Sequence, residues 1–259
     1  AILVPVESSN SISSSLKGYS SLAGLAGIGK TSGADSNAVK AVEKLNSLSF
    51  FENNILPNIN LPDLMAFQSW DSKSNIMLFD EDVYNNKTNS WIQISSKNGN
   101  QTPSSQKSFR KFKADHFSIK EDGTTGFITL SIKHQSPHVA KQWADLLVKQ
   151  INFFYREKDK NEAEKAMNYL NSQIAKTDLT EIKQVIAGLL QQETQKLTLI
   201  EANEAYVFDY IDPPAVMERK VQPRRSTISI LGTFIGFMLS VGLAFVRHLI
   251  FNRQPSQSY

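Results

Sequence analysis

The sequence contains no cysteine, which excludes disulfide bonds, thiolate zinc sites and a cysteine nucleophile together. It also lacks a strong excess of one charge, because 28 Lys and Arg residues against 25 Asp and Glu residues leave a formal net charge of +3. A dedicated nucleic-acid-binding protein would have a large or clustered basic excess. We therefore expect no nucleic-acid partner, and the 259 residues are enough for one or two domains.

One long stretch lacks charge altogether. The nineteen residues from Ile228 to Val246 contain no charged side chain, and about 20 apolar residues are what a helix needs to cross a bilayer. Arg224 and Arg225 precede the stretch and Arg247 follows it, so cationic groups stand where the lipid headgroups would lie. The sequence therefore predicts a transmembrane helix over residues 226–250.

Small residues recur inside this helix. Gly232, Gly236, Ser240 and Ala244 are spaced by four and lie on one face, which would allow the backbone of another helix to approach closely. Glycine is also simply commoner in membrane helices than in soluble ones. Both interpretations, a packing face and ordinary membrane-helix composition, stay open.

Signatures of catalysis are weak. No Gly-x-Ser-x-Gly elbow is present, and the carboxylates are scattered along the chain. His134 and His138 are four residues apart but flank Pro137, so they do not share a helix face, and we expect them to be surface or capping histidines. We predict no catalytic, metal-binding or cofactor-binding residue, and a protein that is not an enzyme.

A phosphate-binding pattern needs separate treatment. Residues 24–31, GLAGIGKT, satisfy the P-loop pattern, and residues 76–80 could pass for the acidic strand that holds magnesium. A P-loop must follow a buried strand and open a helix, whereas the flanking residues of 8–37 are rich in Ser, Gly, Ala and Asn. We interpret 8–37 as a mobile loop and keep a nucleotide-binding protein as the less favoured alternative.

Short elements fill the rest of the first 135 residues. Ala1 to Val6 is typical of a short strand broken by Pro5, and apolar spacing predicts an amphipathic helix over 37–55. Residues 63–79 should form a short helix followed by a strand. Alternating residues in 117–120 and 127–132 around Asp122-Gly123 predict a β-hairpin.

A long helix should follow Ser136, the expected N-cap, and Pro137, at its first position. No proline or glycine intervenes up to residue 176, which corresponds to roughly 60 Å of helix. Its charged middle, residues 156–165, is either a solvated face or a subunit interface. Within it we predict i,i+4 pairs of Lys158 with Glu162 and of Lys160 with Glu164.

A second helix should return along the first. Residues 178–181, DLTE, match a capping box, and an apolar stripe beginning at Ile182 predicts a helix to about Ala205. Residues 206–211 have the composition of a strand, and Pro213 and Pro214 end it. A basic linker containing Pro223 then leads to the membrane helix.

These elements predict an α+β fold: a membrane-proximal α/β domain, a long extended helix in a helical hairpin, and a C-terminal transmembrane helix. The domains expected along the chain are an α/β base (1–135), a helical arm (136–205), a strand and proline-containing linker (206–225), the transmembrane helix (226–250) and a short tail (251–259).

Several stretches resemble one family, the polysaccharide co-polymerases of the Wzz or chain-length-determinant type. The most specific is residues 202–214, ANEAYVFDYIDPP, followed by Pro223-Arg224-Arg225 and the helix with Gly232 and Gly236, which is similar to the proline-rich segment and second transmembrane helix of that family. Residues 136–143 with Ile151-Asn152 resemble the start of its long helix, and residues 22–28 resemble its variable loop.

The resemblance implies an inner-membrane protein with most of its chain in the periplasm and the short tail 251–259 in the cytoplasm, assembled as a homo-oligomeric ring. It implies partners too: an O-antigen polymerase and the growing polysaccharide, whose length the ring sets without catalysis. The first transmembrane helix of the family is not found here. Counted alone, the Lys and Arg residues around 228–246 would place the large domain in the cytoplasm, and we expect a first helix to set the orientation instead.

Other functions remain open beside this one. A periplasm-spanning scaffold or adaptor of an export system would share the membrane anchor and the helical hairpin. The control of length is also open: the oligomer could measure polymer along its surface, scaffold several polymerases, or alter the residence time of a polymerase on the growing chain.

Overall fold

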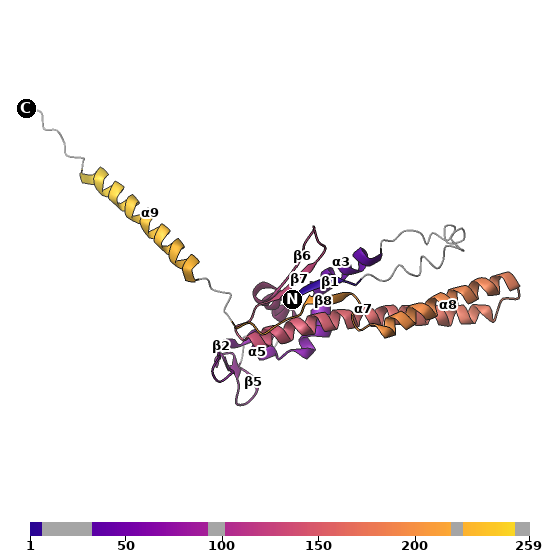
Figure 1. The fold of residues 1–259 in the computed structure, drawn as a ribbon. Coiled ribbons are helices and arrows are strands. Elements are labelled where there is room, and N and C mark those ends of the chain that lie inside the picture. Colours follow the sequence, from indigo (N-terminus) through magenta and orange to yellow (C-terminus); the bar gives the residue numbers. More distant parts are fainter. Residues whose placement is uncertain (7–32, 93–101, 219–224, 252–259) are drawn as a thin grey trace, which may run out of the picture. The chain divides into compact units, whose positions relative to one another are not determined.

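The computed structural model describes residues 1–6, 33–92, 102–218 and 225–251 (Figure 1). The chain divides into two compact units, Ala1–Val216 and Met217–Tyr259. Most of the predicted loop 8–37, the P-loop pattern at 24–31, and Pro223 and Arg224 lie outside the described residues. The predicted α+β class is confirmed, with a long helix and one helix able to span a membrane.

A four-stranded antiparallel sheet forms the base of the first unit, with strand order β6-β7-β1-β8. The strands are β1 (Ile2–Pro5), β6 (Phe117–Glu121), β7 (Ile128–Ile132) and β8 (Phe208–Asp212). The predicted strand at the N-terminus is confirmed, and it lies between β7 and β8 in the sheet. Segments 200 residues apart in the chain are therefore hydrogen-bonded neighbours.

The predicted hairpin is β6–β7, paired from Phe117↔Ile132 to Glu121↔Ile128. Its connection is longer than the Asp122-Gly123 signal suggests. The Gly126 amide donates to the Asp122 carbonyl at 2.7 Å, and Gly126 has φ +69°. Because L-residues rarely adopt that conformation, Gly126 rather than Gly123 is the glycine that the turn requires.

The helix predicted over 37–55 is wrong in its continuity and in its start. α3 covers Gly33–Leu45, so residues 33–37 belong to a helix rather than to the loop. A break follows at Ser47, whose Oγ donates to the Lys44 carbonyl at 2.7 Å and accepts from the Phe50 amide at 3.3 Å. Such side-chain bonds to the backbone compete with the helix. Three short segments follow: α4 (Leu48–Phe50), the π-helix η2 (Phe51–Ile55) and the 3₁₀ helix η3 (Leu56–Asn58).

Residues 61–92 form α5 (Leu61–Met65) and two small antiparallel hairpins, β2 (Phe67–Asp71) with β3 (Ile76–Phe79), and β4 (Tyr84–Asn85) with β5 (Ser90–Trp91). The expected single strand in 63–79 is thus a hairpin. The acidic-strand pattern at 76–80 lies on that two-stranded sheet, whereas a P-loop protein needs it in a buried parallel sheet. α6 (Ser105–Lys111) and the π-helix η4 (Phe112–His116) complete the base.

The arm is a hairpin of two helices, α7 (Pro137–Ile174) and α8 (Thr180–Ala202). Both helices were predicted, but their caps differ from the prediction. Ser136 is the N-cap of α7, yet its side chain makes no capping bond. The N-cap of α8 is Leu179 rather than Asp178, so Glu181 falls at the second helical position, where it cannot close a capping box.

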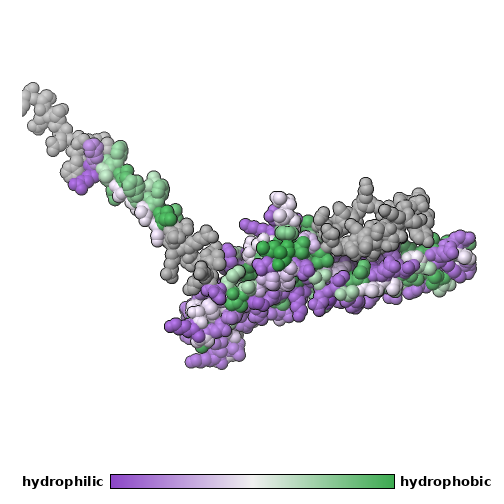
Figure 2. Space-filling model, in the orientation of Figure 1, coloured by the Kyte–Doolittle hydropathy of each residue, from purple (hydrophilic) through white to green (hydrophobic). Residues whose placement is uncertain are grey.

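The core lies where the first half of α7 packs on the sheet. Trp143, Leu147 and Ile151 are at most 2% exposed, as are Leu3 and Phe208 of the sheet. Farther along, only Ala163 of α7 and Ile186 and Ile200 of α8 are buried. The outer part of the arm is therefore a thin two-helix structure, mostly hydrophilic on its surface (Figure 2).

Among its described residues, the second unit has the helix α9 (Arg225–Phe251). Residues Ser229–His248 are long and apolar enough to cross a membrane, and none of that window is buried within the chain. Figure 2 shows mostly hydrophobic residues on the visible face of this helix, with hydrophilic residues near its C-terminal end.

Candidate functional site

Three polar residues of α7 lie at intervals of seven, which is two helical turns, and so share one face of the helix. They are Asp145, Asn152 and Asp159, and each bonds to the segment that leads from the arm toward the membrane helix. We call this set of contacts the polar ladder. It joins α7 to residues 206–210, which include the first part of β8.

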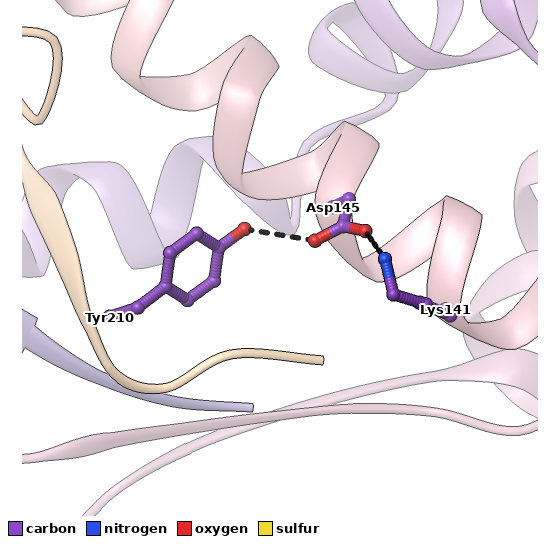
Figure 3. Close-up of polar contacts among 3 residues, drawn as sticks. All are labelled: Lys141, Asp145 and Tyr210. Carbon is purple, nitrogen blue, oxygen red and sulfur yellow. Dashed lines mark hydrogen bonds and ion pairs between the residues drawn. The ribbon is translucent and has the colours of Figure 1, made fainter. Parts of the chain in front are cut away.

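Asp145 is the rung nearest the start of α7 (Figure 3). The Tyr210 hydroxyl donates to its Oδ1 at 3.4 Å, and Lys141 one turn earlier donates to its Oδ2 at 2.8 Å. Burial, followed by the nearby Asp145 charge, raises the pKa of Tyr210 to about 12. The hydroxyl therefore stays protonated and remains a donor at any physiological pH.

Asn152 is the central rung and is buried. Its Nδ2 donates to the Phe208 carbonyl at 2.8 Å, and its Oδ1 accepts from the amides of Val207 and Phe208, both at 2.9 Å. One side chain thus pairs three backbone groups at the start of β8. Without it these groups would be buried unpaired, which is strongly unfavourable.

Asp159 is the third rung, and its Oδ2 accepts from the Tyr206 hydroxyl at 2.7 Å. Burial, then the bond to Asp159, raises the pKa of Tyr206 well above its ordinary value. This hydroxyl also remains a donor at physiological pH.

The next position, Lys160, corrects a predicted ion pair. Lys160 bonds to Glu201 of α8, not to Glu164 on its own helix. The returning helix places Glu201 beside the ammonium group, and sequence spacing cannot reveal such a partner. The other predicted pair, Lys158 with Glu162, is confirmed at 3.6 Å.

His138 is exposed, as the sequence predicts, whereas His134 is half-buried beside Ser136, the N-cap of α7. Its Nε2 lies 3.2 Å from the Asp63 carbonyl, and its Nδ1 accepts from the Ser136 amide at 3.1 Å. The ring packs against His116 and Trp143. Burial lowers the pKa of His134 to about 4.

Those contacts define the protonation state of His134. Since Nδ1 accepts a hydrogen bond, the proton of the neutral ring is on Nε2, which donates to the Asp63 carbonyl.

Within the described part of the chain, no three His, Asp or Glu residues are grouped so that they could hold a metal ion.

The residues predicted to pack in the membrane are all on α9. No heavy atom lies within 4 Å of the position that a Cβ would take at Gly232 or Gly236, leaving aside the helix's own backbone. The Ser240 hydroxyl donates to the Phe237 carbonyl at 2.7 Å, and Ala244 is exposed. A packing partner for this face would have to come from outside the described chain, so the packing role stays a prediction.

The proline motif falls into two parts. Pro213 and Pro214 directly follow β8, where they end the strand as predicted. Arg225 begins α9. The polar ladder lies just before these prolines and was not predicted as a site, although the seven-residue spacing of Asp145, Asn152 and Asp159 was visible in the sequence.

Comparison with known proteins matches one domain. The GNVR family, described as "G-rich domain on putative tyrosine kinase", matches residues 175–249. This range includes α8, β8 and most of α9, and the domain is found in polysaccharide chain-length regulators. No curated protein matches the chain.

Proposed function

We propose that the protein regulates the chain length of a bacterial surface polysaccharide, the O-antigen of lipopolysaccharide, as a non-catalytic partner of a separate polymerase. The observation that carries the proposal is the GNVR match over residues 175–249. The matched range covers α8, β8 and most of α9. The resemblance of residues 202–214 to the co-polymerases supports the same function.

The proposed location is the inner membrane, with the first unit in the periplasm. α9 supports membrane attachment by its length and composition. The periplasmic side rests on the family resemblance, because the count of Lys and Arg residues flanking α9 favours the opposite orientation.

Assembly into a homo-oligomeric ring is the next part of the proposal. Ile182, Val185 and Leu189 of α8 are 44%, 54% and 39% exposed and are spaced by three and four residues, so they form one apolar stripe. A stripe of this kind on a thin arm is typical of a surface that another protein covers. We propose that a second copy of the chain covers it.

A scaffold or adaptor of an export system is the alternative function. It would use the same anchor and the same arm. The two functions differ in the phenotype of a null strain, because loss of a length regulator leaves polymer on the cell surface with an altered length distribution, whereas loss of an export adaptor removes the polymer.

The test compares surface polysaccharide on gels from a strain lacking the gene and from the strain complemented with it. We expect the null strain to lose its modal polymer length and the parent gene to restore it. A Val185→Glu, Leu189→Glu variant should fail to restore it, because two carboxylates on the stripe would have to be desolvated at the interface.

The matched control is Gln191→Glu with Gln195→Glu, which adds the same charge to exposed positions of α8 away from the stripe. Cross-linking should recover oligomers from the control and from the parent but few from the stripe variant. An unchanged length distribution in the null strain would contradict the proposed function, while a normal oligomer in the stripe variant would contradict only the interface.

A second variant addresses α9. We expect Gly236→Leu to stay in the membrane at near-normal abundance, since leucine favours the bilayer at least as well as glycine. If the Gly232–Ala244 face packs on another helix, the added side chain separates the two backbones, and no hydrophobic driving force in lipid compensates for the lost contact. The polymer should then become shorter or unregulated.

Phe237→Leu, one position around the helix, is the control and should behave like the parent. Polymer profiles and cross-linked oligomers would be compared for the two variants. Identical results for both would mean that the small residues reflect only the usual glycine content of membrane helices.

A further inference from the structure

The β2–β3 hairpin has one apolar face that nothing in the described chain covers. Ile76 and Leu78 alternate along β3 and are 55% and 52% exposed. Their cross-strand partners are Asp71 and Ser69, so the face has two large apolar side chains on one strand and polar ones on the other. We call Ile76 and Leu78 the apolar hairpin face.

Strand directions place this hairpin at the end of the base from which the chain leaves. β7 and β8 are both antiparallel to β1, so they run in the same direction and end at the same edge of the sheet. β8 continues from there into Pro213, and β7 continues into His134 and the start of α7.

The hairpin packs against that same junction. The ring centroids of Phe67 and His134 lie 4.5 Å apart, and those of Trp70 and His138 lie 6.3 Å apart. The apolar hairpin face and the exit of β8 therefore belong to one end of the first unit.

We propose that the apolar hairpin face rests in the interfacial layer of the membrane, at the boundary between headgroups and acyl chains. This inference depends on the proposed anchoring of the chain by α9. Eight residues separate Val216 from Arg225, where α9 begins, and such a segment reaches about 28 Å when fully extended. The end of the base where β8 continues toward α9 is thus also the end that carries Ile76 and Leu78.

Apolar burial, not charge attraction, provides the contact. Residues 67–92, which contain the β2–β3 and β4–β5 hairpins, have four carboxylates and two lysines. Anionic lipid therefore does not attract this part of the base. Ile76 and Leu78 gain by leaving water, in proportion to the apolar area that they bury. The contact should therefore not strengthen as the fraction of anionic lipid rises, nor weaken as the ionic strength rises.

The chain contains no cysteine, so single cysteines can carry a fluorescent label without further changes. Leu78→Cys, labelled with the environment-sensitive dye NBD in the full-length protein, would be reconstituted in phosphatidylethanolamine–phosphatidylglycerol vesicles. We expect blue-shifted emission and strong quenching by lipids with a nitroxide near the headgroup. Gln191→Cys, at an exposed position of α8 away from the apolar stripe, should give red-shifted emission and no quenching by these lipids.

Leu239→Cys in α9 reports on the anchor and should be quenched by nitroxides placed deep in the acyl chains. If this label is not quenched, the anchoring by α9 fails together with the inference. If it is quenched and the label at position 78 behaves like that at 191, only the hairpin contact is overturned. Blue-shifted emission at 78 without lipid quenching would mean that protein covers the face, which also overturns the proposal.

Discussion

Replacing Asn152 with leucine should lower the free energy of unfolding of the first unit more than any other single change in the polar ladder. Leucine has a similar volume but bonds to none of the three groups that Asn152 pairs, the amides of Val207 and Phe208 and the Phe208 carbonyl. A buried, unpaired polar group costs about 1–3 kcal/mol, so we expect a total loss of about 3–5 kcal/mol, since such losses are not additive.

The measurement is urea unfolding of the detergent-solubilised protein, followed by tryptophan fluorescence. Trp143 of α7 is buried in the core, so its emission reports on the packing of this helix. Asn161→Leu is the matched control, because Asn161 is exposed on the same helix and bonds only to the carbonyl of Glu157 one turn earlier. The control should change stability by less than about 0.5 kcal/mol, and an equal effect of the two variants would contradict the structural role of Asn152.

Acidification should destabilise the first unit through His134. Burial holds the pKa of His134 at about 4 in the folded chain, whereas an unfolded histidine has a pKa of about 6.5. The unfolded state therefore binds more protons between these two values, so stability rises with pH from about 4 to 6.5 and is constant above. At 1.36 kcal/mol for each unit of pKa, we expect about 3 kcal/mol to be lost over this window.

Neighbouring groups act on the same titration. Burial also lowers the pKa of His116, which contributes in the same direction as His134. Burial raises the pKa of the Asp63 carboxyl, and a raised carboxyl pKa opposes the trend at the acid end of the window, because the folded state then binds the extra proton.

The difference between the parent and a His134→Asn variant isolates His134. Urea midpoints would be compared from pH 4 to 7.5. The variant should be less stable at neutral pH, having lost the ring contacts, but its stability should depend less on pH than that of the parent. Equal pH dependence in the two proteins would mean that His134 does not titrate in this range.

Some elements of the fold follow from local patterns. The charge-free run from Ile228 to Val246 predicts α9 because about 20 apolar residues are what a helix needs to cross a bilayer. The proline at position 137 and the uninterrupted stretch after it predict α7, and alternation predicts β6 and β7. In each case the signal lies within one segment, where spacing and backbone chemistry act directly.

Other predictions failed where a neighbouring segment or a backbone bond decides. Ser47 bonds to the Lys44 carbonyl, and α3 ends before the predicted helix does. Lys160 pairs with Glu201 of α8 instead of with Glu164 of its own helix. His134 is enclosed by residues from three separate segments, including Phe67 and His116. Periodicity carries no information on such partners.

The sequence by itself determined the membrane helix, the helical arm and the resemblance to chain-length regulators, because hydrophobic runs and periodic patterns are local properties of the chain. The tertiary structure alone decided that Asp145, Asn152 and Asp159 bind the strand leading to the membrane helix, and that Ile76 and Leu78 stay uncovered. Both depend on which segments meet after the backbone has folded, since a polar or apolar side chain acquires its role from the groups that surround it.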